Sequence, residues 1–184
     1  MSGDRLLERL KQHSQRSWRR LTRSHPEPSF EPGLAISSAA RAVIEREVMT
    51  FSSSLETGGI LIGHSEPSGL VRVTFASGPG PKAVHLPTYF LRDTQYCANI
   101  LREHYEQSGA DYVGEWHSHV GRMPRPSAGD LMTLNGIMSD PDYDFNVFAM
   151  IIVVSSRRLR RWRLKLNGFI ATKKHITQVK IRNL

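Results

Sequence analysis

The feature that most constrains this chain is a pair of histidines with one residue between them, followed at fixed spacing by a serine and an aspartate. His117 and His119 stand in the segment Gly-Glu-Trp-His-Ser-His, and Ser127 and Asp130 follow them. Because side chains alternate along an extended strand, a strand over residues 111–120 places both imidazoles on one face, with their bases roughly 7 Å apart. One metal ion can reach both.

Asp130 is the natural third ligand of such an ion. Zinc bonds of about 2.0–2.2 Å to two imidazoles and a carboxylate leave a fourth tetrahedral position for water, which separates catalytic zinc from closed structural sites. Ser127 and Asp130 also fit a helix N-cap with an acid at the third helical position. The two interpretations are compatible, but capping leaves the histidines unexplained. The sequence therefore predicts one Zn²⁺ per chain, held by His117, His119 and Asp130.

With an upstream glutamate, this pattern resembles the signature of the JAMM (MPN-plus) metalloprotease family. In that family the glutamate precedes a short glycine-rich strand, and Glu56 fits this position ahead of Gly58 and Gly59. The resemblance covers about residues 34–170. It implies an α/β (α+β) JAMM/MPN fold similar to the cytidine deaminase architecture, with a curved mixed sheet flanked by helices. Val120 departs from the family pattern, in which proline often follows the second histidine.

The resemblance also implies hydrolysis of an isopeptide or peptide bond after a ubiquitin-like C-terminus. Zinc lowers the pKa of water from about 15.7 toward about 7, so a nearby carboxylate, here Glu56, can take the proton and pass it to the leaving amine. Ser127 would hydrogen-bond the oxyanion, and one such donor is typically worth roughly 2.7–4 kcal/mol. Glu115 is a rival base because it alternates onto the histidine face. We expect it instead to orient an imidazole or to form a salt bridge.

Candidate substrate contacts flank the predicted ion. Arg122 and Arg125, in the loop between the histidines and Ser127, could hold acidic side chains or the backbone of an extended tail. The prolines of that loop also suit a simple chain reversal. Gly58 and Gly59 would let a neighbouring strand or a substrate approach closely. The histidines without ligand spacing are expected to be ordinary surface or core residues: His64, His85, His104 and His175.

Within the family, the short single-domain form resembles prokaryotic members, and the segments around Glu56 and His117 are similar to deconjugating peptidases of anti-phage CBASS operons. This implies a protein substrate with an extended C-terminal tail, either a ubiquitin-like protein or a cGAS-like nucleotidyltransferase joined to targets by a fused E1–E2 enzyme. One alternative is a JAMM peptidase of another bacterial ubiquitin-like or sulfur-carrier pathway. The other is a non-catalytic interaction module, which the full set of signature residues disfavours.

Length and composition agree with one compact cytoplasmic enzyme. The chain has 184 residues, a single-domain length. The lone Cys97 excludes an internal disulfide and fits a reducing compartment. Its helical surroundings make it a buried structural cysteine rather than a nucleophile. We expect no membrane span and no secretory signal, because no run of about 18 apolar residues and no apolar N-terminal stretch occurs.

Positive charge is concentrated near the end of the sequence. Residues 155–184 contain ten Lys/Arg and no Asp/Glu, whereas residues 34–154 contain eight Lys/Arg and thirteen Asp/Glu. Such a surface can steer an acidic partner. Arg161, Arg163 and Lys165 alternate with apolar residues, which predicts a half-buried strand with a solvated cationic face. Trp162 falls on the other face, which argues against a nucleic-acid module.

The periodicity divides the chain into an arm and a domain. Residues 1–33 are predicted as a basic arm, an amphipathic helix over 1–23 followed by a proline-rich linker, which either docks on the body or a partner or frays. A metalloprotease domain is predicted over 34–184. Its expected helices are 38–49, 93–107 and 127–138, and its expected strands are 59–64, 70–77, 111–120, 145–154, 160–167 and 174–182.

Overall fold

The computed structural model describes residues 30–51, 54–121, 123–143, 145–158 and 161–184. The helix predicted over residues 1–23 lies outside this part of the chain. An eight-stranded mixed sheet runs in the order β10-β1-β3-β2-β6-β7-β8-β9, and a separate hairpin pairs β4 with β5. The strands are β1 (Gly33–Ile36), β2 (Gly58–Ser65), β3 (Leu70–Ala76), β4 (Val84–Leu86), β5 (Tyr89–Leu91), β6 (Asp111–His119), β7 (Phe148–Arg158), β8 (Arg161–Ala171), β9 (Ile176–Val179) and β10 (Ile181–Asn183).

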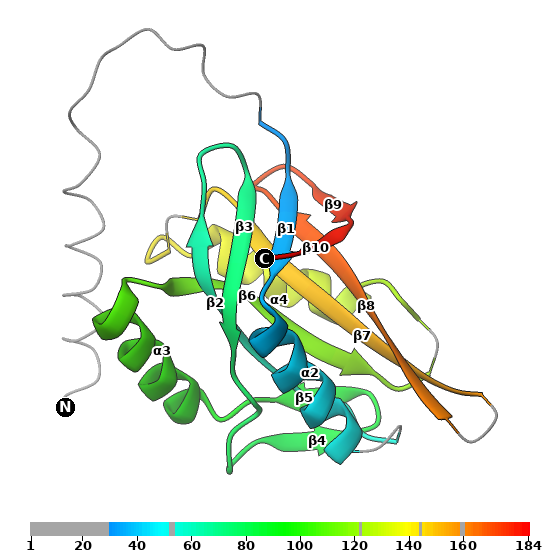
Figure 1. Ribbon diagram of the computed structural model, residues 1–184. Helices are drawn as coiled ribbons and strands as arrows, with labels where there is room; N and C mark the ends of the chain where they lie inside the picture. The colour runs from blue at the N-terminus through cyan, green and yellow to red at the C-terminus, as the bar shows by residue number, and fades with distance from the viewer. Residues whose placement is uncertain (1–29, 52–53, 122, 144, 159–160) are drawn as a thin grey trace, which may run out of the picture.

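Three helices cover the two faces of the curved sheet: α2 (Ser38–Thr50), α3 (Thr94–Ser108) and α4 (Ala128–Ser139), as Figure 1 shows. Alternation along β7 assigns the faces. Ile151 and Val153 pack in the core cluster that contains Ile44 of α2, whereas Met150 and Ile152 pack with α4. Because neighbouring strand residues point to opposite faces, α2 and α4 lie on opposite sides of the sheet.

The sheet curves far enough to bring its two ends close together, so that it is nearly a barrel. Residues 174–182, predicted as one strand, are two: β9 pairs with β8, and β10 pairs in parallel with β1. A Cβ at Gly168 of β8 would lie 2.7 Å from Ile181 of β10 and 3.0 Å from Leu34 of β1. Glycine therefore permits the close packing of β8 against β1 and β10.

The bounds predicted for the three helices and for the strand that carries His117 and His119 are confirmed to within about one residue. Ser37 caps α2, Asp93 caps α3, and Gly109 ends α3 in the left-handed conformation at φ 67°. The strand predicted from residue 145 begins at Phe148, because Phe145 stacks on Tyr143 at 5.2 Å instead of joining the sheet. The short strand β1 and the β4–β5 hairpin were not predicted, since three- and four-residue strands carry little periodicity.

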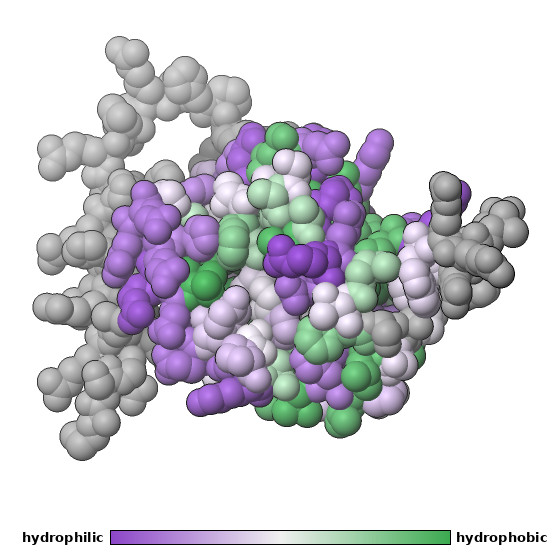
Figure 2. Space-filling view, turned by 60° about the horizontal axis from the view of Figure 1, so that its bottom comes forward, coloured by the Kyte–Doolittle hydropathy of each residue, from purple (hydrophilic) through white to green (hydrophobic). Residues whose placement is uncertain are grey.

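Eight of the exposed apolar side chains among the described residues lie in two groups. One belongs to the β4–β5 hairpin, and the other to the start of α4 and the loop before it: Val84, Leu86, Tyr89 and Leu91, and Val120, Met123, Leu131 and Met132. In Figure 2, hydrophobic residues gather along the lower edge of a face that is otherwise largely hydrophilic. Among the described residues, no helix is long and apolar enough to cross a membrane.

Candidate metal centre

Strand β6 carries both histidines at its C-terminal end, between two hydrogen-bonded neighbours. His117 pairs with Gly58 of antiparallel β2 and with Ile152 of parallel β7, and His119 pairs with Val154. Pairing on both sides fixes the strand register, and a shift of one residue would turn both imidazoles to the other face. The sheet thus determines where the two rings point.

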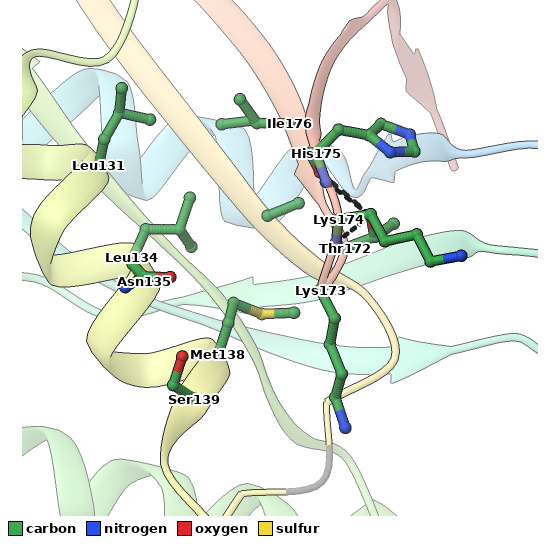
Figure 3. Close-up of a pocket in the computed structure, with 11 residues that line it drawn as sticks. Leu131, Leu134, Asn135, Met138, Ser139, Thr172, Lys173, Lys174, His175 and Ile176 are labelled. Atoms are coloured by element: carbon green, nitrogen blue, oxygen red, sulfur yellow. Dashed lines mark hydrogen bonds between the residues drawn. The ribbon is translucent and has the colours of Figure 1, made fainter.

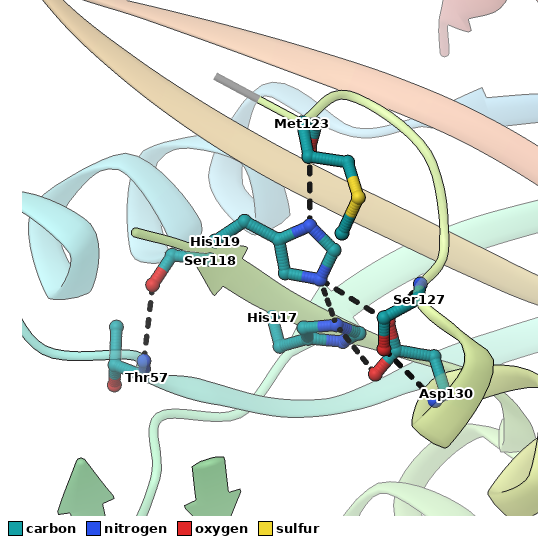
Figure 4. Close-up of polar contacts among 7 residues, drawn as sticks. All are labelled: Thr57, His117, Ser118, His119, Met123, Ser127 and Asp130. Atoms are coloured by element: carbon teal, nitrogen blue, oxygen red, sulfur yellow. Dashed lines mark hydrogen bonds and ion pairs between the residues drawn. The ribbon is translucent and has the colours of Figure 1, made fainter. Parts of the chain in front are cut away.

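The helix that follows brings Asp130 to the two imidazoles (Figure 4). The Nε2 atoms of His117 and His119 lie 3.0 Å apart, and the two carboxylate oxygens of Asp130 lie 3.2 Å and 3.1 Å from them. All three ligand atoms lie within 4.8 Å of one another. Tetrahedral bonds of about 2.0–2.1 Å set ligand atoms about 3.3 Å apart. Two imidazole nitrogens and one carboxylate at this spacing fit a zinc ion.

A second hydrogen bond sets the protonation of His119. Its Nδ1 lies 3.0 Å from the main-chain oxygen of Met123. A carbonyl oxygen only accepts, so Nδ1 carries a proton, and Nε2 is the nitrogen that faces Asp130 and that a metal ion would bind. Outer hydrogen bonds of this kind orient metal-ligating histidines.

Ser127 and Asp130 form a complete capping box at the start of α4. The main-chain N–H of Asp130 donates to Ser127 Oγ at 3.2 Å, and the N–H of Ser127 donates to Asp130 Oδ2 at 2.6 Å. Burial alone would raise the pKa of Asp130, but hydrogen bonds from His117, His119 and Ser127 hold it well below its usual range. The helix cap therefore presents an ionised carboxylate to the histidines, and the capping and metal-binding interpretations hold together.

Glu56 lies beside this cluster, immediately before β2. Burial raises the pKa of its carboxyl group, while the nearby His119 and His117 and a hydrogen bond from the Val120 main chain act in the opposite direction. The adjoining Thr57 is bonded to the strand that carries the two histidines. Its N–H donates to Ser118 Oγ at 3.0 Å (Figure 4), and its carbonyl accepts from the Ser118 N–H at 2.7 Å. The glutamate is thus held at the cluster by the segment that leads into β2.

Glu115 was expected either to orient an imidazole or to form a salt bridge, and it forms a salt bridge. The carboxylate is buried and pairs with the guanidinium of Arg92 and the hydroxyl of Tyr112. Burial and the negative charge of Glu115 raise the pKa of Tyr112 well above its ordinary value. Arg92 and Tyr112 did not stand out in the sequence, since only tertiary folding brings them to Glu115.

The candidate substrate-binding residues are placed less uniformly. Arg125 is exposed on the loop between β6 and α4, and Arg122 lies outside the described residues. A Cβ at Gly58 would lie 2.4 Å from the Trp116 carbonyl oxygen, and one at Gly59 would lie 2.3 Å from the Ser77 carbonyl oxygen. Both glycines admit close packing of the chain's own backbone. Contact of these residues with a substrate stays a prediction.

A cavity of about 430 Å³ lies along α4, between the helix and the turn that joins β8 to β9. Met138 extends from α4 toward the turn that carries Lys173 and Lys174 (Figure 3). His117, His119 and Asp130 do not line this cavity, although Asp130 belongs to the same helix. The cavity is therefore separate from the candidate metal cluster.

Cys97 belongs to the core, as predicted, and so does Trp116. Trp116 is buried on the opposite side of β6 and donates from Nε1 to the Ser77 carbonyl at 3.0 Å. Cys97 is buried on α3, and burial raises the pKa of its thiol. A thiol with a raised pKa is a weaker nucleophile at neutral pH, so the thiol contributes to packing.

Comparisons with known proteins agree with this arrangement. Residues 37–165 match the family described as prokaryotic homologs of the JAB domain. The chain is 35% identical over 99 residues to a CD-NTase/cGAS isopeptidase of Enterobacter hormaechei subsp. hoffmannii (strain UCI 50), covering 53% of this chain and 54% of that protein. It is 34% identical over 84 residues to a CD-NTase/cGAS isopeptidase of Escherichia coli (strain TW11681), covering 45% and 53%. The matches span about half the length of these relatives.

The fold resembles a solved structure as well. The solution structure of a Desulfitobacterium hafniense protein superposes with a TM-score of 0.58 at 15% identity, over 82% of this chain and 94% of that one. At this identity the likeness concerns the fold alone.

Proposed function

This chain belongs to the family of prokaryotic homologs of the JAB domain, and we propose that it is a zinc-dependent isopeptidase. The observation that carries the proposal is the convergence of His117, His119 and Asp130 within 4.8 Å, with the carboxyl group of Glu56 beside them. Structural zinc sites have four protein ligands, whereas three protein ligands leave the fourth coordination position open for water or substrate. The catalytic domain is residues 34–184.

The proposed substrate is a cGAS-like nucleotidyltransferase joined through its C-terminal tail to a target protein. Two relatives bear the name CD-NTase/cGAS isopeptidase, at 34% and 35% identity. The corresponding pathway is CBASS anti-phage defence in the bacterial cytoplasm, in which a fused E1–E2 enzyme makes the bond. A ubiquitin-like protein of another bacterial pathway, or a sulfur carrier, is the alternative substrate. A non-catalytic module has less support, because the signature residues are all present.

The residues divide the reaction among them. His117, His119 and Asp130 would hold Zn²⁺, which supplies Lewis acidity and lowers the pKa of water. Glu56 accepts a proton from the attacking water and returns it to the leaving amine, so that it ends as it began. Ser127 Oγ accepts from the Asp130 N–H, which leaves its own hydroxyl proton to donate to the developing oxyanion.

The environment of Glu56 suits proton transfer. A general base works best when its pKa lies near the working pH, and an ordinary carboxyl group lies well below neutrality. Burial at the end of β6 raises the pKa of Glu56. The carboxyl group is therefore closer to the value that a proton carrier needs than an exposed glutamate would be.

The test is cleavage of a CD-NTase fused at its C-terminus to a reporter protein. Zinc-loaded wild type should cut at the junction, and Glu56→Gln should retain one zinc per chain but lose turnover. Glu103→Gln, on the exposed face of α3, is the matched control and should cleave like wild type. Cleavage by Glu56→Gln at the wild-type rate would reject Glu56 as the base. No cleavage by zinc-loaded wild type would reject this substrate, and fusions to ubiquitin-like proteins would then be tested.

A further inference from the structure

The β4–β5 hairpin holds both main-chain polar groups of Glu56. The N–H of Glu56 donates to the carbonyl of Leu86 at 3.0 Å. The carbonyl of Glu56 accepts from Nδ1 of His85 at 2.9 Å, and His85 lies on the same short strand as Leu86. Because a carbonyl cannot donate, this contact assigns the Nδ1 proton of His85. The peptide groups on both sides of the Glu56 Cα are thus held by the hairpin.

The imidazole that makes this contact is itself held in place. It stacks on Phe51, the C-cap residue of α2, with ring centroids 3.9 Å apart and planes 16° apart. The ring of Phe90 on β5 lies 5.4 Å from the imidazole, measured between centroids, and is tilted by 40° to it. Close parallel stacking restricts rotation of the ring about its own bonds. The donor therefore has a fixed position relative to α2 as well as to the hairpin.

The opposite side of the same segment is tied to the metal-bearing strand. Thr57, directly after Glu56, exchanges two hydrogen bonds with Ser118, which stands between the two candidate ligands. Glu56 consequently bridges the hairpin and β6. Its carboxyl group stays beside the cluster only while the hydrogen bonds to the hairpin and those between Thr57 and Ser118 are both intact.

We propose that His85 is a positioning residue, whose Nδ1–H fixes the main chain of Glu56 so that the carboxylate meets the metal centre. The inference rests on the proposed function of Glu56 as the base. A misplacement of about 1 Å in a reacting group can reduce turnover by roughly a hundredfold. Loss of the His85 donor should therefore lower kcat while leaving KM and metal binding unchanged.

Two substitutions separate the hydrogen bond from the stacking. His85→Phe keeps an aromatic ring against Phe51 and removes the donor, and it should lower kcat about tenfold or more at unchanged KM and one zinc per chain. His85→Asn keeps an N–H near the Nδ1 position and removes the ring, and it should stay within about threefold of wild type. His104→Phe is the matched control. His104 lies on α3, and its ring also packs against a phenylalanine, Phe75, with centroids 4.1 Å apart. A purely packing role would reverse the order of the two His85 variants and overturn the proposal.

A measurement without substrate or metal separates this inference from the proposed function. Amide hydrogen exchange in the metal-free protein should be roughly fivefold faster at residues 55–58 in His85→Phe, because an anchoring hydrogen bond is lost. His85→Asn and His104→Phe should exchange there like wild type. Faster exchange together with a wild type that cleaves neither the CD-NTase fusion nor ubiquitin-like fusions would reject the isopeptidase but keep the anchor. Unchanged exchange in His85→Phe would reject the anchor, whatever the activity.

Discussion

Ser118 of β6 and Thr57, the residue before β2, exchange two hydrogen bonds, and this pair couples the strand that carries the two histidines to the candidate base. The Ser118 N–H donates to the Thr57 carbonyl at 2.7 Å, and the Thr57 N–H donates to Ser118 Oγ at 3.0 Å. Ser118 lies between the two histidines, and Thr57 follows Glu56. The two parts of the site therefore move together, even though about sixty residues separate them in sequence.

Ser118→Ala should weaken both stability and turnover. The substitution leaves the N–H of buried Thr57 without an acceptor, which costs about 1–3 kcal/mol in the free energy of unfolding. Thr57→Val is the control. Thr57 Oγ1 is buried and has no hydrogen-bond partner among the described residues, so its replacement by a methyl group should be neutral or stabilising. Urea denaturation measures both variants, and equal stability of Ser118→Ala and wild type would contradict the coupling.

Ser127→Ala should affect the chain in two separable ways. Loss of the N-cap of α4 should cost about 1 kcal/mol of stability. Loss of the oxyanion donor should lower kcat by a further factor of about 10²–10³. Ser37→Ala removes the equivalent cap from α2, away from the metal centre. The control should lose comparable stability and keep kcat. Equal kcat values for the two variants would assign Ser127 to capping alone.

Metal binding should appear as thermal stabilisation of the folded chain. Zinc at a concentration of 100 times its Kd should add about 2.7 kcal/mol to the free energy of unfolding, and a chelator should remove it. Asp130→Asn and His117→Ala should show little or no increase in Tm with zinc. His175→Ala changes an exposed histidine at the β8–β9 turn and should respond like wild type. A zinc-dependent Tm in Asp130→Asn equal to that of wild type would place the ion elsewhere.

The site was predictable where its determinants are local in sequence. His117, His119, Ser127 and Asp130 lie within fourteen residues, and strand alternation and helix capping fix their geometry. Glu56 needed the family pattern, because no local rule links it to residues sixty positions later. His85 looked like an ordinary surface or core histidine, since its partners, Phe51 and Glu56, meet it only through the hairpin.

The parts of the fold that were predicted are likewise those that depend on residues close together in sequence. The helices of twelve to fifteen residues begin at clear N-cap residues, so their bounds were predicted closely. The break between β9 and β10 was not predictable from periodicity. It depends on β10 reaching β1 at the other end of the sheet, a contact between residues about 150 positions apart.

The protonation of Glu56 should depend on the metal. Burial raises the pKa of its carboxyl group above the ordinary value of 4.5 in the metal-free chain. A bound cation stabilises the charged carboxylate, so zinc should lower the pKa again. A side-chain ¹³C NMR titration of Glu56, with and without zinc, measures both values. A metal-free midpoint at or below 4.5 would contradict the effect of burial, and an upward shift on adding zinc would contradict the placement of the ion.

Glu115→Gln should lower stability and Glu56→Gln should lower kcat. This difference distinguishes the two candidate bases. Glu115 is buried and ion-paired with Arg92, so neutralising it should cost roughly 3–5 kcal/mol in stability. Its carboxylate is occupied by Arg92 and Tyr112, so the folded variant should keep kcat within a few-fold of wild type. Glu56→Gln should change stability little and abolish turnover. Urea denaturation and kcat, measured on zinc-loaded protein, test both. Loss of kcat in a stably folded Glu115→Gln would make Glu115 the base.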